Sequence, residues 1–431
     1  MDERVILQVL ADQREELNMQ QNMMLCSRKE EELFELDSHL AQVVIGVRRS
    51  GKSTLCHKVL RDRGIKYGYV NFDDDRLASL KIDDLNAVLS CIYQLYGTNV
   101  QYLFMDEIQN VDGWYLFVNR LSRQSIHIIL TGSNAKLLSG ELATHLTGRY
   151  NEIRLFPFSY CEYLEYNGVD KFGLTTKAEA ERKMALDGYL MEGGMPELIH
   201  MKNDRTKRIY IEGLVETILQ KDIAVRYKIR NIEGLRRLAN HLINNTCQVI
   251  DYLSLLELTG IKSENTIRKY VSYLSQAFLI QKIQKFSYKS RERICNEKVY
   301  VVDTGFIANR ENSLLSKSLG WRLENAIYTE IRRRYLSQAE DVYYYKEDAR
   351  SKELDFVICR QGVAVELVQV AYSISDKDTY KREMDALVQV AKKLKCLHLS
   401  LITLDESREV VYDGMNVHIY NAVEWMITTN H

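Results

Sequence analysis

The chain has 431 residues, of which 46% are hydrophobic and 27% charged, and this is typical of a globular protein with about two to four domains. It contains no apolar run near the ~18 residues of a membrane span, and its charged N-terminus excludes a signal peptide, so we expect no membrane partner. The net charge of −1 predicts no attraction of the whole protein to nucleic acid, and eight scattered cysteines without a CxxC pair favour a reducing cytoplasm over zinc or disulfides.

Strands alternate with helical patterns in the first part of the chain. Residues 3–40 are expected to be helical, because apolar residues recur near helical spacing before a charged run. Strands are then expected at 41–46, 66–72, 100–107, 125–133 and 150–158. Alternating strands and helices predict an α/β fold, with a parallel sheet that helices cover on both faces.

The segment GVRRSGKS, residues 46–53, fits the pattern G-x-x-x-x-G-K-[ST]. Its glycines let backbone N–H groups turn inward around phosphate oxygens, and the following helix points its positive end at the same anion. Lys52 would reach the terminal phosphates, and the Ser53 hydroxyl would ligate Mg²⁺. The alternative, a glycine-rich turn with an exposed lysine, is disfavoured by the strand before it and the helix after it. The expected nucleotide-binding residues are Gly46, Val47, Arg48, Arg49, Ser50, Gly51, Lys52, Ser53 and Thr54.

The segment YLFMDE, residues 102–107, supplies the second half of this site. Its apolar residues form a buried strand that delivers Asp106 to the carboxyl edge of the sheet, where Asp106 would hold Mg²⁺. Glu107 would polarise the attacking water, although a solvated charge at a strand end is the alternative. The inserted strand YGYVNF and the D-E pair mark P-loop proteins that hydrolyse ATP through a strand-end glutamate. The absence of N-K-x-D favours ATP over GTP.

Three further catalytic candidates follow the next strand. Ser133 and Asn134 end that strand, where a polar side chain would lie between Asp106 and the γ-phosphate; a plain turn with a helix cap at Ser133 is the alternative. Arg149 would stabilise transition-state charge, either in its own chain or from a neighbouring subunit, which would require self-association or a protein partner. Pairing of Arg149 with a local acid such as Glu152 is equally compatible with the sequence.

Strands stop after Pro157, and residues 159–245 are predominantly helical in pattern. Residues 246–312 predict a helix-turn-helix followed by a wing, with Arg268, Lys269 and Ser272 facing outward. This winged helix would bind DNA phosphates, or else it packs against the ATPase core. Further positive charge in and after the wing comes from Lys282, Lys285, Lys289, Arg291, Arg293 and Lys298, and Glu264, Glu292 and Glu297 dilute it.

Several motifs in one order resemble a family of bacterial and archaeal AAA-like ATPases that carry a C-terminal domain of unknown function. The resemblance covers about residues 40–390 and implies the fold and ATP binding, while it leaves the cellular role open. Glu192, Gly193, Gly194 and Pro196 match a lid-region motif of this family, and Lys221 and Asp222 match another, but neither suggests a chemistry. The motifs are GVRRSGKST, YVNFDDDRL, FMDEIQ, LTGSNAKLL, LTGRY, FPFSYCEYL, EGGMPEL and ILQKDI.

The last part of the chain resembles a PD-(D/E)xK nuclease core, as the C-terminal region of that family often does. Glu324 on a helix and Asp355 on a strand match its pattern, but Gln369 and Ala371 stand where an acid and a lysine are needed. Glu366 is near, but on a regular strand it faces away from Gln369. The sequence therefore predicts a degenerate domain without nuclease activity.

Together these patterns predict an α/β protein with a P-loop parallel-sheet ATPase core, a helical and winged-helix middle and a restriction-nuclease-like C-terminal domain. The expected function is Mg²⁺-dependent ATP binding and slow hydrolysis that acts as a nucleotide-dependent switch, with DNA as one partner. The alternatives are an ATP-dependent nuclease and a non-enzymatic DNA- or protein-binding scaffold that ATP stabilises. The expected divisions are 1–40, 41–158, 159–245, 246–312 and 313–431.

Overall fold

The fold is α/β, as expected, and in this computed structural model the chain forms two compact units. The first contains residues 1–156 together with 276–278, and the second contains residues 157–275 and 279–431. The structure describes residues 1–20, 25–135, 148–287, 289, 296–308, 315–335, 341–347, 352–405 and 407–428.

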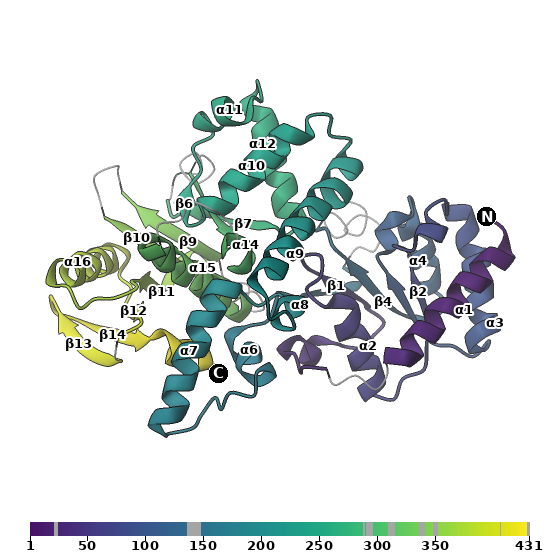
Figure 1. Ribbon diagram of the computed structural model, residues 1–431, viewed down its shortest axis with the longest axis horizontal. Coiled ribbons are helices and arrows are strands. Elements are labelled where there is room, and N and C mark those ends of the chain that lie inside the picture. Colours follow the sequence, from purple (N-terminus) through teal and green to yellow (C-terminus); the bar gives the residue numbers. More distant parts are fainter. Residues whose placement is uncertain are drawn as a thin grey trace. The chain divides into compact units, whose positions relative to one another are not determined.

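The first unit is built on a five-stranded parallel sheet with the order β2-β3-β4-β1-β5. Each of the five expected strands is present, and helices lie between β1 and β2, between β2 and β3, and between β3 and β4 (Figure 1). Because β4 lies between β1 and β3, the ends of these three strands meet at one edge of the sheet. The strands are β1 (Ala41–Ile45), β2 (Tyr67–Asn71), β3 (Tyr102–Asp106), β4 (His127–Gly132) and β5 (Tyr150–Arg154).

The N-terminal helix is shorter than the sequence predicts. It ends at Gln20, and the charged run later forms only a short 3-10 helix, Lys29–Leu33. The reason lies in the apolar residues that follow, because Phe34 and Leu36 are both buried at a spacing of two, which is typical of extended backbone. Both pack into the core of this unit. The α-helices here are α1 (Glu3–Gln20), α2 (Lys52–Asp62), α3 (Leu85–Tyr96) and α4 (Trp114–Ser122).

The second unit is built on a nine-stranded mixed sheet with the order β13-β14-β12-β11-β10-β9-β7-β8-β6. Helix α15 packs into a core on one face of its C-terminal strands and α16 into a core on the other (Figure 1). The strands are β6 (Gln248–Val249), β7 (Ile280–Lys285), β8 (Glu297–Val301), β9 (Asp341–Lys346), β10 (Glu353–Arg360), β11 (Val363–Val370), β12 (Leu399–Thr403), β13 (Arg408–Tyr412) and β14 (Met415–Asn421).

Helices fill the rest of the second unit, and one segment, Ile218–Val225, is π-helical. No described helix in the chain is both long and apolar enough to cross a membrane. The α-helices are α6 (Tyr160–Tyr166), α7 (Thr176–Glu192), α8 (Pro196–Ile199), α9 (Asp204–Thr217), α10 (Ile232–Asn244), α11 (Ser254–Thr259), α12 (Glu264–Gln276), α14 (Gly305–Ala308), α15 (Leu315–Tyr335), α16 (Lys377–Leu394) and α17 (Ala422–Ile427).

Strand pairing crosses the expected division at residue 312. Strand β7 pairs in parallel with β9, with Gln284 opposite Tyr343, so one sheet includes the strands on both sides of that division. The expected parts from residue 159 onward accordingly form one compact unit, apart from residues 276–278.

Candidate nucleotide site

The loop after β1 has the backbone shape of an anion-binding turn. Arg49 and Gly51 have positive φ angles of 68° and 94°, and α2 begins at Lys52. Such a loop turns successive N–H groups inward, and the helix N-terminus adds partial positive charge. A Cβ atom on Gly46 would lie 2.2 Å from the carbonyl oxygen of Leu155. Only glycine therefore fits where the loop passes the end of β5.

Lys52 lies inside this loop. Its side chain is only 5% exposed, and its ammonium donates hydrogen bonds to the carbonyls of Gly46 and Val47 at 3.2 and 3.1 Å. The ammonium is also 3.9 Å from a carboxylate oxygen of Glu107. A cation held here, beside inward-facing N–H groups, is placed to meet the terminal phosphates of a nucleotide.

The other loop residues differ in their surroundings. Arg48 forms an ion pair of 3.1 Å with Asp73, after β2, and Thr54 is exposed on α2. Ser50 is fully buried, and among the described residues its hydroxyl has no hydrogen-bond partner. A buried hydroxyl of this kind is costly unless something supplies a partner, which fits a loop that receives a polar ligand.

Asp106 is buried at the end of β3 and is surrounded by hydroxyl groups. Its carboxylate accepts hydrogen bonds from Thr131, from Tyr69 at 3.3 Å and from Ser53. Burial and then the neighbouring Glu107 raise the pKa of Asp106, while Thr131, Ser53 and Lys52 oppose the rise. Burial and the Asp106 charge also raise the pKa of Tyr69 well above its usual value, so this hydroxyl remains a donor.

Ser53 and Asp106 are chemically suited to Mg²⁺. Both present oxygen atoms, and Mg²⁺ usually takes one or two protein ligands while phosphates and water complete its shell. No cluster of three or more His, Cys, Asp or Glu side chains suited to a metal occurs in the described part of the chain. These two oxygen ligands therefore fit a Mg²⁺ ion whose shell the phosphates of a nucleotide and water would complete.

Glu107 is held in an unusual backbone conformation directly after Asp106. Its φ angle is 52°, and its N–H donates to the Thr131 hydroxyl at 3.1 Å. Its carboxylate accepts bonds from Gln109 and from the N–H and hydroxyl of Ser133, the last two at 3.3 and 3.2 Å. The geometry brings Ser133 and Glu107 together beside Lys52, as a group that can orient a water molecule.

The structure places the two remaining catalytic candidates differently. Asn134 is fully buried, next to Ser133 after β4. Arg149 is exposed, and its carbonyl accepts the N–H of Ala41 at the start of β1. The phosphate loop follows the other end of β1, so Arg149 lies at the opposite edge of the sheet and cannot reach a nucleotide bound to the same chain.

Thr131 and Tyr69 were missed by the sequence reasoning. Thr131 lies two residues before Ser133, so the alternation of a strand places both on the same side of β4. That spacing is a usable signal for Thr131. Tyr69 reaches Asp106 because β2 pairs with β3, with Asn71 opposite Asp106, and nothing in the local sequence indicates this.

Most basic residues expected around the wing are already engaged. Arg268 pairs with Glu264 at 2.7 Å and lies 3.7 Å from the centre of the Tyr252 ring. Lys282 pairs with Glu297 at 2.8 Å, and Lys285 donates to the carbonyl of Glu347 at 3.2 Å. Lys269 is exposed on α12, Ser272 is half-buried and Lys289 is exposed. Arg291, Glu292 and Arg293 lie outside the described residues.

Lys298 was expected to be a surface cation, and this expectation is wrong. It is buried on β8, and its ammonium lies 2.7 Å from Glu324, 2.7 Å from Glu353 and 3.7 Å from Asp355. Although burial lowers the pKa of Lys298, the three carboxylates together raise it well above its usual value. An internal ammonium therefore occupies the acidic cluster to which Glu324 and Asp355 belong.

The other nuclease-like positions on β11 point to opposite faces. Glu366 accepts hydrogen bonds from Tyr335 at 2.6 Å and Ser400 at 2.9 Å. Gln369 donates to Glu383 on α16 at 2.7 Å, and Ala371 is buried in the core on that same face. The orientation of Glu366 away from Gln369 is thus confirmed, and Glu366 does not join the acidic cluster.

The lid-region motif has a structural explanation. The N–H groups of Gly194 and Gly305 donate to the buried carboxylate of Asp303 at 2.7 and 2.9 Å. A Cβ atom on Gly193 would lie 1.9 Å from that carboxylate. The motif therefore lets the backbone approach Asp303 closely. Lys221 and Asp222, the other matched pair, lie in the π-helical segment.

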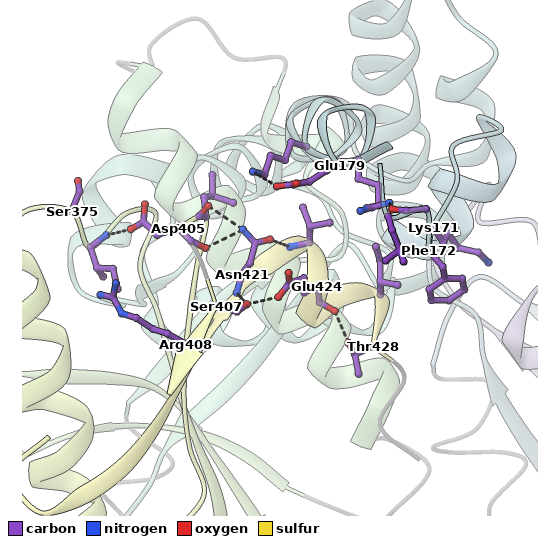
Figure 2. A pocket seen from close by; sticks show the side chains of 18 residues that line it. Lys171, Phe172, Glu179, Ser375, Asp405, Ser407, Arg408, Asn421, Glu424 and Thr428 are labelled. Carbon is purple, nitrogen blue, oxygen red and sulfur yellow. Dashed lines mark hydrogen bonds and ion pairs between the residues drawn. The ribbon is translucent and has the colours of Figure 1, made fainter. Parts of the chain in front are cut away.

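The second unit contains a separate cavity of about 910 Å³. Figure 2 shows Asp405, Asn421, Ser407 and Glu424 along its wall, with hydrogen bonds among them. Asp405 accepts the N–H of Ile374 at 2.6 Å, and Asn421 donates to the carbonyl of Asp405 at 3.0 Å. These hydrogen bonds tie the segment between β12 and β13 to the junction of β14 and α17.

Comparison with known proteins places these features in context. A family model described as an AAA domain matches residues 38–164, which confirms the expected AAA-like P-loop core. Models described as domains of unknown function, DUF8612 and DUF4143, match residues 183–316 and 319–421. The C-terminal match names no activity, so the nuclease-like fold stays a proposal.

Two relatives extend this similarity over almost the whole chain. An uncharacterized protein of Methanocaldococcus jannaschii is 33% identical over 400 residues, covering 90% of this chain and 88% of the relative. An uncharacterized protein of Haemophilus influenzae is 33% identical over 409 residues, covering 91% of this chain and 95% of the relative. Among solved structures, a Walker-type ATPase of Pyrococcus abyssi is 18% identical with a TM-score of 0.45, covering 66% of this chain and 95% of that one.

Proposed function

We propose that this chain, which is an AAA-like P-loop ATPase and belongs to the same family as the uncharacterized Methanocaldococcus and Haemophilus proteins, binds Mg·ATP and hydrolyses it slowly as a switch. The nucleotide-binding ATPase class follows from the family. Magnesium dependence, slow turnover and switching between domain arrangements are the proposal.

The observation that carries this proposal is that neighbouring residues could bind the phosphates, the metal and the attacking water separately. Lys52 would face the terminal phosphates, and Ser53 with Asp106 would hold Mg²⁺, which would neutralise charge on the phosphates. Glu107, held by Thr131 and Ser133, would orient the attacking water and accept its proton. Charge neutralisation and water activation are the two requirements of phosphoryl transfer to water.

Calorimetry of ATP binding tests the phosphate assignment. Lys52→Ala removes the cation inside the loop and should abolish most ATP affinity. Lys58→Ala is the matched control, because Lys58 lies on the same helix but pairs with Glu31 and Asp62. Equal affinity in wild type and Lys52→Ala would contradict the proposal.

A second candidate function is DNA binding by the region of the expected winged helix, residues 246–312. The described elements of this region follow α10 in the order β6, α11, α12, β7, β8 and α14, which supports the winged-helix proposal. The core of this region takes Ile267, Val271 and Leu274 from α12. Lys269 therefore faces outward. Lys262 lies two residues before the first residue of α12. Both lysines are exposed and have no ionic partner among the described residues, which favours phosphate contacts.

Binding of labelled duplex at several salt concentrations tests this candidate. Lys262→Glu with Lys269→Glu should weaken binding, and the affinity should fall steeply with salt. Lys392→Glu is the control, since it changes a distant exposed lysine on α16. If wild type shows no binding at low salt, packing is the role of this region.

Other parts of the proposal follow from single observations. Arg149, exposed at the far edge of the sheet, would act only on a nucleotide held by a neighbouring subunit, so we propose self-association for that role. Free thiols at all seven described cysteines support a cytoplasmic location. Turnover without DNA cleavage favours the switch, Mg²⁺-dependent cleavage favours a nuclease, and binding without turnover favours a scaffold.

A further inference from the structure

Residues 276–278 pack with the nucleotide-site unit, although the chain on both sides packs in the second unit. They begin at the last residue of α12 and continue to Phe278. The next residue, Leu279, donates its N–H back to the carbonyl of Leu274 at 3.1 Å. Residues 276–278 therefore form a short segment that belongs to a unit otherwise made of residues 1–156.

The first contact of this segment reaches the end of β4. The N–H of Ala135 donates to the carbonyl of Gln276 at 2.8 Å. Ala135 directly follows Ser133 and Asn134, and Ser133 donates two hydrogen bonds to Glu107. The carbonyl of Gln276 thus anchors the short segment that orients the candidate water-activating acid.

The second contact reaches the end of β5. The guanidinium of Arg154, the last residue of β5, lies 5.2 Å from the centre of the Phe278 ring. The next residue, Leu155, donates its N–H to Ile45 at 2.8 Å, and its carbonyl packs against Gly46. The Phe278 ring therefore supports the strand end against which the phosphate loop is packed.

The backbone of Phe278 is itself constrained. Its φ angle is 57° and its side chain is buried. A bulky residue keeps this left-handed conformation only where its surroundings hold it, and such residues gather at functional sites. The hydrogen bond from Ala135 to Gln276, the contact between Arg154 and the Phe278 ring, and the burial of that ring together stabilise this conformation.

We infer that Gln276 and Phe278 are positioning residues for ATP hydrolysis, through which residues 276–278 complete the ATPase site of the unit to which they belong. They act through Ser133 and the phosphate loop and do not need to touch the nucleotide. The inference rests on the proposed hydrolysis, and it makes turnover depend on a segment beyond the AAA match at residues 38–164.

Steady-state ATP turnover and ATP calorimetry on the full chain test this inference. Phe278→Ala removes the ring, and Ala135→Pro removes the donor to Gln276. Each should lower kcat by about ten- to a hundredfold while KM and Kd stay near the wild-type values, because misplaced groups impair chemistry more than binding. Phe278→Tyr and Ala135→Ser keep the ring and the N–H, and they should retain wild-type turnover.

Trp425→Leu is the matched control, since it removes a ring that lies 3.9 Å from Arg334 in the second unit. Thermal unfolding of every variant identifies loss of fold, and the two sites give independent tests. Normal kcat in both Phe278→Ala and Ala135→Pro, or an equal fall in Trp425→Leu, would overturn the inference while ATP turnover itself stands. Absence of turnover in the wild type would contradict the proposed function and this inference with it.

Discussion

At the scale of single residues, Glu107 and Asp106 are adjacent yet should respond differently to substitution. Glu107→Gln keeps an acceptor for Ser133 but removes the group that takes the proton from water. We expect Mg·ATP to bind normally and turnover to fall by about 10²–10⁴-fold, the usual contribution of a general base. Calorimetry measures the binding of Mg·ATP, and the rate of phosphate release measures turnover. Wild-type turnover in this variant would mean that another group accepts the proton.

Asp303 should give the second unit a measurable pH dependence. Burial raises the pKa of Asp303 from 3.8 to about 6, against the two N–H groups that lower it. Because the folded pKa exceeds the unfolded one, the stability from this group is complete below about pH 4 and is lost as the pH rises through about 6. The loss should approach about 3 kcal/mol, since one pKa unit is worth about 1.4 kcal/mol.

Urea unfolding of the wild type and of Asp303→Asn between pH 4 and 8 tests this expectation. Asparagine does not titrate, so the difference between the two stability curves isolates Asp303. The wild type should lose stability relative to the variant between about pH 4 and 7. Parallel curves would show that Asp303 has an ordinary pKa.

At the scale of elements, Lys298 joins β8 to α15 and β10 through three carboxylates. Lys298→Met keeps most of the side-chain volume but leaves Glu324, Glu353 and Asp355 without their cation. Breaking a buried ion pair from one side costs about 3–5 kcal/mol, so we expect a loss of that size in denaturant unfolding. Lys282→Met, which breaks one more exposed pair of the same sheet, should cost about 1 kcal/mol or less.

The effect of Lys298→Met should also shrink in acid, because protonated carboxyl groups need no cation. A loss no larger than that of Lys282→Met at neutral pH would contradict the internal-ammonium interpretation.

The strands of the first unit were largely predictable, and the residues that the sequence misassigned or missed share a physical cause. Buried parallel strands leave continuous apolar runs, so β1 to β5 were found within a few residues. The phosphate loop and the D-E pair were found because their chemistry fixes residue type and spacing. Lys298 was misassigned because β8 looks like a charged wing, and its burial depends on acids contributed by α15 and β10. The contacts of Thr131, Tyr69 and Phe278 likewise depend on partners that only the folded chain brings together.

At the scale of the whole molecule, we expect no cleavage of DNA or RNA with Mg²⁺ or Mn²⁺, with or without ATP. An ammonium already occupies the acidic cluster, Gln369 is neutral and bonded to Glu383, and Ala371 offers no polar group. Plasmid DNA, single-stranded DNA and RNA should remain uncleaved after incubation with the purified protein. Cleavage that disappears in a variant with Glu324→Ala and Asp355→Ala would restore the nuclease alternative.

The nine-stranded sheet has a consequence for how this protein could have evolved. Residues 183–316 and 319–421 match two different family descriptions, as separately inherited modules would. Yet β7 pairs with β9, and Lys298 in the first module neutralises acids in the second. Recombination that delivered residues 319–421 alone would expose the unpaired edge of β9, which favours aggregation. It would also leave the buried acids without the cation that neutralises them. Selection should therefore transmit the two modules together, and a fusion partner can replace neither one singly.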